Sequence, residues 1–407
     1  MSDHAHSLTV VPDPGPLRAP VLKIAAIALL VLGAATFAFL LLKDTPRAWS
    51  AFLQGMLIPT FIGIGATFFI AVHSTANAKW HTPLRRVMEG LSTGLLITPI
   101  AFALIAAFGG TWLYDWIYLE GSDAHAHLFH VHGGTKAEVM VWWRWVLTNS
   151  IIIALWLWLR YRMVKLSTDQ DLTQADIRAK HLRLSIAFLP IFAIGLTFFV
   201  WDMLLSLHVN WFSTMWGVYC FTSAVQTFLC VTILFMLWFK RSRSQALFPQ
   251  HTVHDIATWM VGWSCFCAYI GFSQFMLIWY ANLDEETFFY LTRFQHGWGL
   301  QYAIEAFIRW PVVFLGLMSQ SVRTRPWALT IVCIIALTGN WMDWNWIIQP
   351  AMSPNVYRSP FSWQELLVGA GFVGAFLLLA LRFWGRHGIV AKGDTRLLPT
   401  INAEHMH

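Results

Sequence analysis

The sequence is constrained most strongly by a run of 28 residues, 256–283, that contains no Asp, Glu, Lys or Arg. A helix of this length, at about 1.5 Å per residue, exceeds the roughly 30 Å hydrocarbon core of a bilayer. After an acidic turn at 284–286, the chain returns to apolar sequence that contains Glu305 and Arg309. Charged groups inside such a run are costly in lipid, so they are usually buried in protein and often functional. The stretch from Trp259 to Trp310 therefore predicts two membrane helices, the second carrying a charged pair.

The composition of the whole chain agrees with this prediction. Hydrophobic residues make up 57% of the 407 residues and charged residues 12%, against about 25% charged in ordinary globular chains. Together with a mean hydropathy of +0.55, this indicates an all-α, polytopic membrane protein. The net charge of +6 comes from basic residues in short loops, where membrane topology explains them, so we expect no nucleic-acid partner.

Ten apolar segments predict ten transmembrane helices. They cover roughly residues 22–42, 48–73, 91–114, 139–160, 184–207, 211–239, 256–281, 296–320, 326–349 and 363–385. The two tails and the loops after the even-numbered segments carry 20 of the 27 Lys and Arg residues, and the opposite loops carry 5. The positive-inside rule then places both termini in the cytoplasm. We expect a disordered cytoplasmic tail at 1–20, the ten-helix domain at 21–390 and a cytoplasmic tail at 391–407.

Paired features recur with a period of four segments. Arg144 in the fourth segment and Arg309 in the eighth are each followed by a tryptophan. Asp202 in the fifth segment and Asp343 in the ninth each lie beside tryptophans near the outer end. Because four is an even number of crossings, the two copies would have the same orientation. The repeat predicts two four-helix bundles, segments 2–5 and 6–9, flanked by segments 1 and 10; the alternative is a chance recurrence of the abundant tryptophan.

Glu305 and Arg309 are the first side chains that could carry chemistry. They are four residues apart and share a helix face in the favourable order. Either charge alone would cost about 3 kcal/mol at the middle of a membrane, and the adjacent cation favours the ionised carboxylate. One interpretation is a locked structural pair. The other is a proton-exchange site, in which Glu305→Gln slows proton-coupled turnover and leaves assembly intact.

A second set of polar residues follows the outer half of the fifth segment. Asp202, Ser206 and His208 occur in an order in which acid, hydroxyl and imidazole could relay protons outward. Asp343, with Asn345 nearby, could play the same part in the second bundle. The alternative for each aspartate is an interfacial carboxylate satisfied by a helix end or lipid headgroups. The predicted proton path thus comprises Asp202, Ser206, His208, Glu305, Arg309 and Asp343.

The sequence contains no recognisable set of cofactor ligands. The five cysteines form no CxxC or CxxCH motif, which excludes iron–sulfur clusters and covalently attached haem c. His73 lies near the inner end of its segment while His208 and His296 lie near outer ends, so no pair meets at one depth to hold haem b. We therefore predict no redox cofactor in this chain, and partner subunits would have to carry electrons.

Two loops contain patterns with more than one interpretation. The outer loop holds a string of four histidines that could bind a metal, although a solvated loop is the simpler interpretation, and we predict no metal site. These histidines are His125, His127, His130 and His132. The polar stretch 167–180 predicts a short helix on the cytoplasmic surface.

Two stretches resemble a known family. WDMLLSLHVNWFSTMWGVY at 201–219 and FSQFMLIWYANLDEET at 272–287 are similar to one of the two large membrane subunits of bacterial alternative complex III, a quinol:electron-acceptor oxidoreductase, and the resemblance extends over all ten segments. The family tends to have Asp-Pro-His after the Ser-Leu pair, where this chain has His208-Val209-Asn210. Asp284 also stands where the family commonly has proline.

The resemblance implies a non-redox subunit, related to NrfD-type polysulfide-reductase quinone anchors, in the bacterial inner membrane. It implies two four-helix bundles and a candidate proton route, with the quinol site assigned to a sibling subunit. The implied partners are a multihaem cytochrome c subunit, an iron–sulfur subunit, a homologous NrfD-type membrane subunit, and smaller membrane and haem subunits. Haem and iron–sulfur clusters would reside in those partners, with lipids around this chain.

Other functions stay open at this point. The chain could bind quinol itself, with His73 beside Glu89 or Asp202 beside Trp201 as acceptor and aromatic wall. A standalone secondary transporter is a further alternative, although paired glycine-broken helices around a midplane site are not evident. The last alternative is a structural membrane protein with no chemical role of its own.

Overall fold

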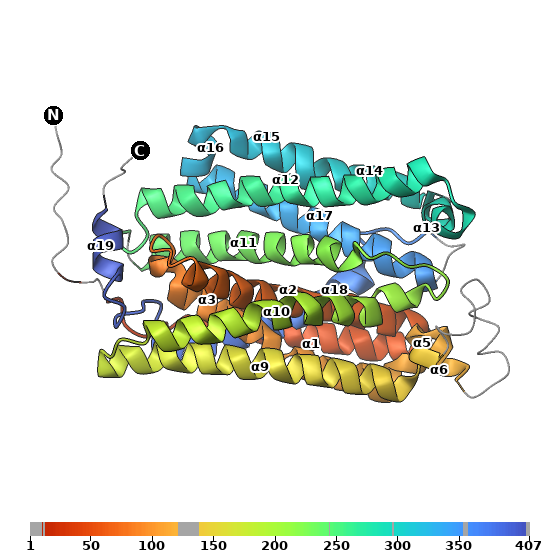
Figure 1. Cartoon of the computed structure of the whole chain (residues 1–407), viewed down its shortest axis with the longest axis horizontal. Coiled ribbons are helices and arrows are strands. Elements are labelled where there is room, and N and C mark those ends of the chain that lie inside the picture. Colours follow the sequence, from red (N-terminus) through yellow and green to blue (C-terminus); the bar gives the residue numbers. More distant parts are fainter. Residues whose placement is uncertain are drawn as a thin grey trace.

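The computed structural model describes residues 10, 13–120, 138–243, 245–294, 297–352 and 357–403, and within these ranges the secondary structure is helical, without a β-strand. The long helices lie side by side along one axis of the molecule (Figure 1). In the described ranges, nine helices are long and apolar enough to cross a membrane, which indicates a multi-pass membrane protein. They are α1 (Pro20–Lys43), α2 (Thr45–Thr75), the segment Thr82–Leu113, α10 (Arg178–Met203) with its extension to Leu207, α11 (Trp216–Ser242), α12 (Gln250–Ala281), the segment Trp298–Met318, α17 (Pro326–Met352) and α18 (Trp363–His387).

A further long helix, α9 (Trp142–Thr173), corresponds to the predicted segment 139–160 and packs along α10. It is not one of the nine, because Arg144, Asn149 and several tryptophans interrupt its aliphatic run. The prediction of a separate surface helix at 167–180 was wrong. Helix α9 continues through this region to Thr173 and α10 starts at Arg178, because polar side chains on the last turns of α9 are buried against the C-terminal residues.

Two of the apolar segments are not continuous α-helices. The third consists of η1 (Thr82–Leu84), α3 (Arg85–Leu91), η2 (Ser92–Leu96), α4 (Thr98–Leu104), η3 (Ile105–Gly109) and α5 (Gly110–Leu113). The eighth consists of α14 (Trp298–Phe307), η6 (Ile308–Val312) and α15 (Val313–Met318). Both η3 and η6 are single π-helical turns, and η6 contains Pro311, whose missing N–H disturbs the regular ladder. Such turns occur frequently at functional sites.

The helices pack in two groups around α2, which is buried on nearly every face. Helix α2 contacts the third segment and α10, and α9 packs on the outside of α10. Helices α11, α12, α17 and the segment α14–α15 contact one another, and α11 joins this group to α2. Helices α1 and α18 pair along their length, and Gly33 and Gly371 permit the approach, since a Cβ on Gly33 would lie 2.4 Å from the Cα of Gly371.

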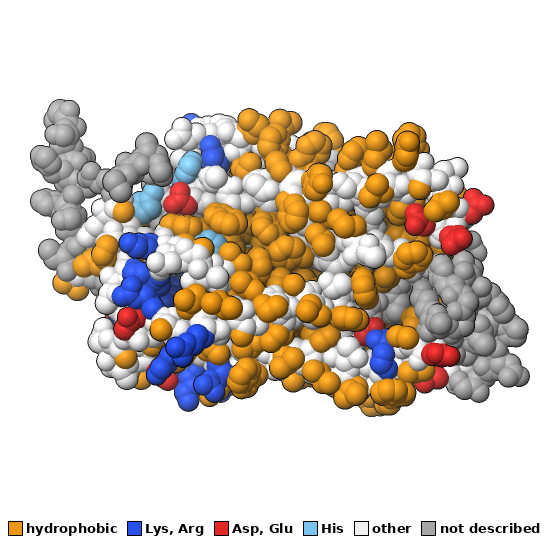
Figure 2. Space-filling view, viewed as in Figure 1, with side chains coloured by type: hydrophobic (Ala, Val, Ile, Leu, Met, Phe, Trp, Pro, Cys, Tyr) orange, Lys and Arg blue, Asp and Glu red, His pale blue; other side chains and the backbone are white. Residues whose placement is uncertain are grey.

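The two ends of the molecule differ in charge. Lys and Arg gather at the end that carries α19 (Leu397–Asn402), whereas acidic side chains lie at the opposite end and apolar side chains cover the surface between them (Figure 2). Both described ends of the chain lie at the basic end, where Lys392 forms an ion pair with Asp13 and the Leu17 N–H donates to the Trp384 carbonyl at 3.3 Å. The remaining short helices are α6 (Asp115–Tyr118), α13 (Asp284–Phe294) and α16 (Gln320–Thr324). The acidic turn at 284–286 is thus the first turn of α13.

Candidate functional site

The predicted pair of Glu305 and Arg309 belongs to a larger buried cluster. Glu305 lies on α14 and Arg309 on the π-helical turn η6, so both lie in the middle of the eighth segment. Asp343 of α17 and Tyr219 of α11 approach the same guanidinium. Glu305 is 3% exposed, Arg309 6% and Asp343 0%. The structure therefore brings three members of the predicted proton path together inside the protein.

Arg309 is the centre of this cluster. Its Nη1 atom lies 2.9 Å from Asp343 Oδ2, 3.4 Å from Glu305 Oε1 and 3.3 Å from the Tyr219 hydroxyl. The Tyr219 hydroxyl in turn donates a hydrogen bond to Asp343 Oδ1. One guanidinium thus faces two carboxylates. The Tyr219 hydroxyl contacts both the guanidinium and the closer carboxylate, that of Asp343. Charge-assisted contacts of this kind are among the strongest polar interactions in proteins.

The backbone around Arg309 is adapted to this arrangement. The Arg309 carbonyl accepts hydrogen bonds from Ser264 Oγ at 3.3 Å and Gln226 Nε2 at 3.4 Å, so α11 and α12 bind the π-helical turn directly. On the other side, Gly339 of α17 allows close packing, because a Cβ there would lie 3.2 Å from the Arg309 Cβ. These contacts fix the helix axis that carries the charged pair.

A cavity of about 730 Å³ adjoins the cluster between α12 and the segment α14–η6. Its lining includes Tyr219, Glu305 and Arg309, together with apolar and aromatic side chains of α12 and α14. Three buried atoms of the cluster have no hydrogen-bond partner, namely Glu305 Oε2, Arg309 Nε and Asp343 Oδ2, of which only Asp343 Oδ2 lies in an ion pair, with Arg309. Buried polar groups in folded proteins are nearly always paired, so the other two atoms mark the cluster as chemically incomplete.

Asp202 lies in a second, separate polar site. Both of its carboxylate oxygens accept from the Arg144 guanidinium, at 3.0 and 3.2 Å, and Oδ2 also accepts from Asn149 Nδ2 at 2.8 Å. The Trp145 indole N–H donates to the Asp202 carbonyl at 2.9 Å. A cavity of about 300 Å³ borders this site beside the last turn of α10. Asp202 is thus satisfied by α9 rather than by a helix end or solvent.

Ser206 and His208 do not continue from the Asp202 carboxylate. The Ser206 hydroxyl donates to the Asp202 carbonyl at 2.6 Å, and within the described chain neither residue hydrogen-bonds to His208. His208 instead contacts Arg293 of α13, whose guanidinium also donates to the Ile347 carbonyl at 3.0 Å. Burial and the neighbouring guanidinium lower the pKa of His208 well below its usual value, and burial lowers the pKa of Arg293 to about 9. A neutral His208 imidazole can therefore accept from Arg293, which ties the loop after α10 to α13 and α17.

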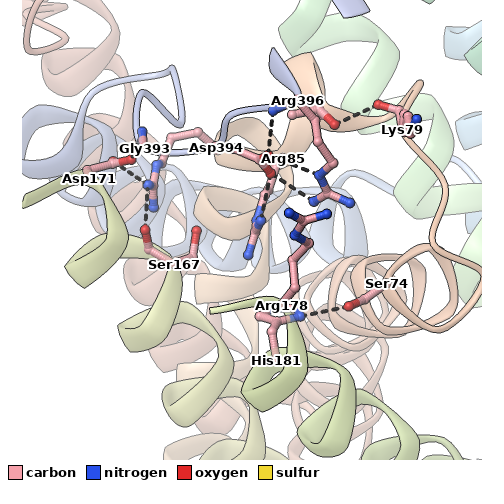
Figure 3. Close-up of polar contacts among 12 residues, drawn as sticks. Ser74, Lys79, Arg85, Ser167, Asp171, Arg178, His181, Gly393, Asp394 and Arg396 are labelled. Atoms are coloured by element: carbon pink, nitrogen blue, oxygen red, sulfur yellow. Dashed lines mark hydrogen bonds and ion pairs between the residues drawn. The ribbon is translucent and has the colours of Figure 1, made fainter. Parts of the chain in front are cut away.

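A third polar cluster closes the basic end of the molecule (Figure 3). Asp394 of the C-terminal segment accepts from Arg85 at 3.0 Å and from Arg396 at 2.8 Å, and the Gly393 N–H donates to Asp171 of α9 at 2.8 Å. Burial alone would raise the pKa of Asp394, but the hydrogen bonds from Arg396 and the charge of Arg85 lower it below its usual range. The residues after α18 are thus docked on the bundle by ion pairs.

The other sequence candidates, His73 and Glu89, have different partners. The His73 ring nitrogen Nδ1 pairs with the Phe69 carbonyl, whereas Glu89 binds Arg85 at 3.3 Å and also pairs with Arg86. No group of three or more His, Cys, Asp or Glu side chains in the described ranges is placed to hold a metal ion. The four-histidine loop and His296 lie outside the described residues.

Searches against protein-family models and curated proteins returned no match. The sequence patterns placed the acids correctly inside helices but missed two partners, Arg144 for Asp202 and Tyr219 for Asp343. The four-segment recurrence was the available signal for Arg144: if Arg309 and Asp343 form a pair in one copy, then Arg144 and Asp202 are the equivalent residues in the other. Tyr219 carried no such signal, because a tyrosine near a helix end commonly marks only the membrane interface.

Proposed function

We propose that this chain is a multi-pass subunit of a quinol-oxidising electron-transfer complex in a bacterial inner membrane, and that it exchanges protons at Glu305, which shares Arg309 with Asp343. The observation that carries the proton-exchange part is the excess of acid over base around Arg309. Two carboxylates within 3.4 Å of one guanidinium leave one negative charge uncompensated when both are ionised. Binding of a single proton neutralises that charge, and low-dielectric surroundings make charge neutrality strongly favoured.

The unpaired Glu305 Oε2 atom makes Glu305 the exchangeable member of the two acids. Asp343 already receives the Tyr219 hydroxyl and the Arg309 guanidinium, whereas Glu305 has one oxygen without a partner and lines the adjoining cavity. A proton donor that reaches this cavity can therefore approach Glu305. Acids inside membrane segments are characteristic of proton relays in pumps and transporters.

The assignment to a quinol-oxidising complex is supported by the resemblance of residues 201–219 and 272–287 to a large membrane subunit of alternative complex III. On this proposal the partners are multihaem cytochrome c, iron–sulfur, homologous NrfD-type and smaller membrane subunits, which hold the haem and iron–sulfur groups. The sibling membrane subunit binds the quinol that supplies the electrons. This chain contributes structure and the route for protons.

The proposed topology has ten crossings with both termini in the cytoplasm. Asp13 and Lys392, which lie near the two described ends of the chain, form an ion pair at one end of the bundle, and this supports an even number of passes. The described ranges contain nine apolar helices, an odd number, and we propose α9 as the tenth crossing. The gathering of Lys and Arg at the end with the chain termini supports a cytoplasmic location for that end (Figure 2).

The experiment is to affinity-tag the chain in its native host, purify it in mild detergent and return the preparation to vesicles. We expect haem-containing partners to co-purify, and quinol addition to produce proton release that a pH dye reports. A chain that purifies alone or as a homo-oligomer, without haem absorbance, would contradict the assignment to the complex. A haem-containing complex whose proton release is unchanged by Glu305→Gln would contradict only the proton-exchange part.

A further inference from the structure

A polar cavity of about 490 Å³ lies where the connection between α9 and α10 meets the C-terminal segment. Its volume is within the roughly 300–1,000 Å³ typical of small-molecule sites. Gln174, Asp176 and Arg178 line the cavity and are exposed, so a molecule outside the protein can reach it. No residue of the Glu305–Arg309 cluster contributes to its lining.

Three arginines from distant parts of the chain line this cavity. Arg85 belongs to α3, Arg178 to the first turn of α10 and Arg396 to the C-terminal segment. In Figure 3 the Arg178 side chain extends from α10 toward the other two. Asp394 pairs with Arg85 at 3.0 Å and with Arg396 at 2.8 Å. Asp176 pairs with Arg178 at 3.2 Å.

The charges around the cavity do not balance. With the lining imidazoles neutral, three guanidiniums face two carboxylates, which leaves one positive charge in excess. The ion pairs continue behind the wall to Glu89 and Asp171, and both of these acids pair with Arg86. Arg160 lines a small cavity together with Glu89 and supplies the second matching cation. The excess of one positive charge therefore remains when the whole network is counted.

Side-chain donors in the cavity are accessible to a ligand. The Arg178 side chain is 59% exposed, and its two terminal nitrogens have no partner in the part of the chain that the structure describes. The Arg396 side chain is 15% exposed and binds Asp394 through Nε and Nη2, which leaves Nη1 for another acceptor. Arg85 Nη2 has almost no accessible surface, so Arg85 contributes positive charge and not a direct contact.

The start of α10 adds backbone donors at the same place. The N–H groups of Ala179 and Lys180 belong to the first turn and have no hydrogen-bond partner among the described residues. Ala179 lines the cavity. The first N–H groups of a helix point away from it along its axis, and the helix dipole favours a negative charge there.

We propose that this cavity binds a phosphate group that carries one negative charge, as a phosphodiester does. Its oxygens accept from the guanidiniums of Arg178 and Arg396 and from the first N–H groups of α10, and its charge neutralises the excess of the surrounding arginines. Guanidinium groups and helix N-termini are donors well suited to phosphate. The phosphate belongs either to an anionic membrane lipid or to a soluble molecule, and the binding chemistry is the same for both.

Other occupants fit the cavity less well. A metal cation would meet a net positive lining, in which Asp176 and Asp394 are already paired with arginines. An acyl chain or another neutral apolar molecule would offer no acceptor to the guanidinium and N–H donors. The phosphate site is independent of proton exchange at Glu305 and of the assignment to a quinol-oxidising complex, so each can fail without the other.

The test uses the full-length protein, with any partners that accompany it, in dodecyl maltoside, a detergent without phosphate, after washing until no lipid phosphorus remains. The probes are dioctanoyl phosphatidylglycerol, its phosphate-free analogue dioctanoylglycerol, and inorganic phosphate. Hydrogen exchange in the peptide 174–182 measures binding, because a bound phosphate accepts from N–H groups of that peptide. We expect saturable slowing of exchange with a phosphate probe and none with dioctanoylglycerol. The probe that acts at the lower concentration identifies the source as a lipid or a soluble phosphate.

Three variants test the charges. Arg178→Gln should weaken the apparent affinity for the phosphate probe about tenfold, because a hydrogen bond to a charged group is lost. Arg183→Gln is the matched control and should leave the affinity unchanged, since Arg183 is an exposed arginine of α10 outside the cavity lining. Asp176→Asn removes an acid beside Arg178 and should strengthen binding about threefold.

The proposal is overturned if the Arg178→Gln and Arg183→Gln proteins bind the phosphate probes equally. It is also overturned if dioctanoylglycerol slows exchange as much as dioctanoyl phosphatidylglycerol does, or if neither phosphate probe slows exchange in the wild-type protein. Proton release plays no part in these measurements, so their failure leaves the proposed proton exchange untouched.

Discussion

The two arginine–aspartate pairs of this protein use the same chemistry in different surroundings. Arg144 and Asp202 form a two-point ion pair near the end of their helices, with an arginine side chain that is 21% exposed. Arg309 and Asp343 meet in the interior, where the arginine side chain is 7% exposed. The second pair has an additional acid, Glu305, with a carboxylate oxygen that lacks a partner, whereas at the first pair the unpaired buried atoms are Arg144 Nε and Asn149 Oδ1, and both oxygens of the acid are paired.

This difference indicates that the Arg144–Asp202 pair holds two helices together, whereas the Arg309–Asp343 pair belongs to a site that can exchange a proton. At the first site every Asp202 oxygen has a donor from α9, so the pair holds α9 against α10 and has no charge left to exchange. At the second site one cation faces two acids, so the cluster is balanced only when a proton is bound. An ion pair inside a membrane segment is therefore informative about function chiefly through what is left unpaired around it.

The largest difference should follow removal of the arginine from each site. We expect Arg309→Met to destabilise the folded protein by about 3–5 kcal/mol, because two buried carboxylates lose their cation. Arg144→Met should cost about 1–2 kcal/mol, since Asp202 keeps its Asn149 donor and lies beside an open cavity. Unfolding in sodium dodecyl sulfate, followed by circular dichroism, measures both. Equal losses would remove the distinction between the sites.

Coupling between the two acids at the inner site should be the next largest effect. Asp343→Asn leaves Arg309 with Glu305, and Glu305→Gln leaves it with Asp343, so each single change keeps one ion pair. The double variant has none, and we expect it to be about 1–3 kcal/mol less stable than the sum of the single changes. The same unfolding assay completes the double-mutant cycle. Strict additivity would mean that the two acids do not share the arginine.

A smaller effect is expected from the indole that supports the outer site. Trp145→Phe removes the hydrogen bond to the Asp202 carbonyl and should destabilise the protein by about 1 kcal/mol. Trp143→Phe is the matched control, because that side chain is 61% exposed on the same helix. If both variants unfold at the same detergent concentration, the indole hydrogen bond does not stabilise the contact of α9 with α10.

The smallest effect should be a pH dependence of local stability at the basic end of the molecule. This region lies outside both arginine–aspartate sites and serves as a reference for them. Burial and nearby charges lower the pKa of His81, so the unfolded chain binds this proton more readily and stability falls as the pH drops below about 6.5. Asp394, with its lowered pKa, contributes stability that is lost only below about pH 4.

Hydrogen exchange in the peptide 397–402 should therefore accelerate between about pH 7.5 and pH 5.5, after correction for intrinsic rates. The His81→Gln protein should show a weaker acceleration. An acceleration of the same size in both proteins would assign the pH dependence to another group.

Much of the helical layout could be predicted from the sequence because apolar length alone determines it. Predicted segments such as 326–349 and 363–385 end within a few residues of α17 and α18. The bounds of helix α13 could not be predicted in this way. It is an amphipathic helix of 11 residues that does not have to span the bilayer, so apolar length does not identify it. The docked C-terminal residues depend on an ion pair of Asp394 with Arg85 and a hydrogen bond from the Gly393 N–H to Asp171, both with partners more than 200 positions away in the chain.

The candidate site was predictable only in part. The spacing of Glu305 and Arg309 predicts their contact, and the structure confirms it at 3.4 Å. The stronger contact of Arg309 with Asp343, and the unpaired Glu305 oxygen, depend on how α17 and α12 pack around the π-helical turn. That packing is set by interhelical distances, which hydropathy and periodicity do not contain.

Proton release from vesicles that contain the assembled complex tests the central claim most directly. Glu305→Gln is compared with Glu365→Gln, since Glu365 is an equally buried acid that already has a full partner, Arg47, at 2.7 Å. The account predicts that Glu305→Gln lowers the rate of quinol-dependent proton release by at least about tenfold while Glu365→Gln leaves that rate unchanged. Proton release at the wild-type level in the Glu305→Gln complex would contradict it.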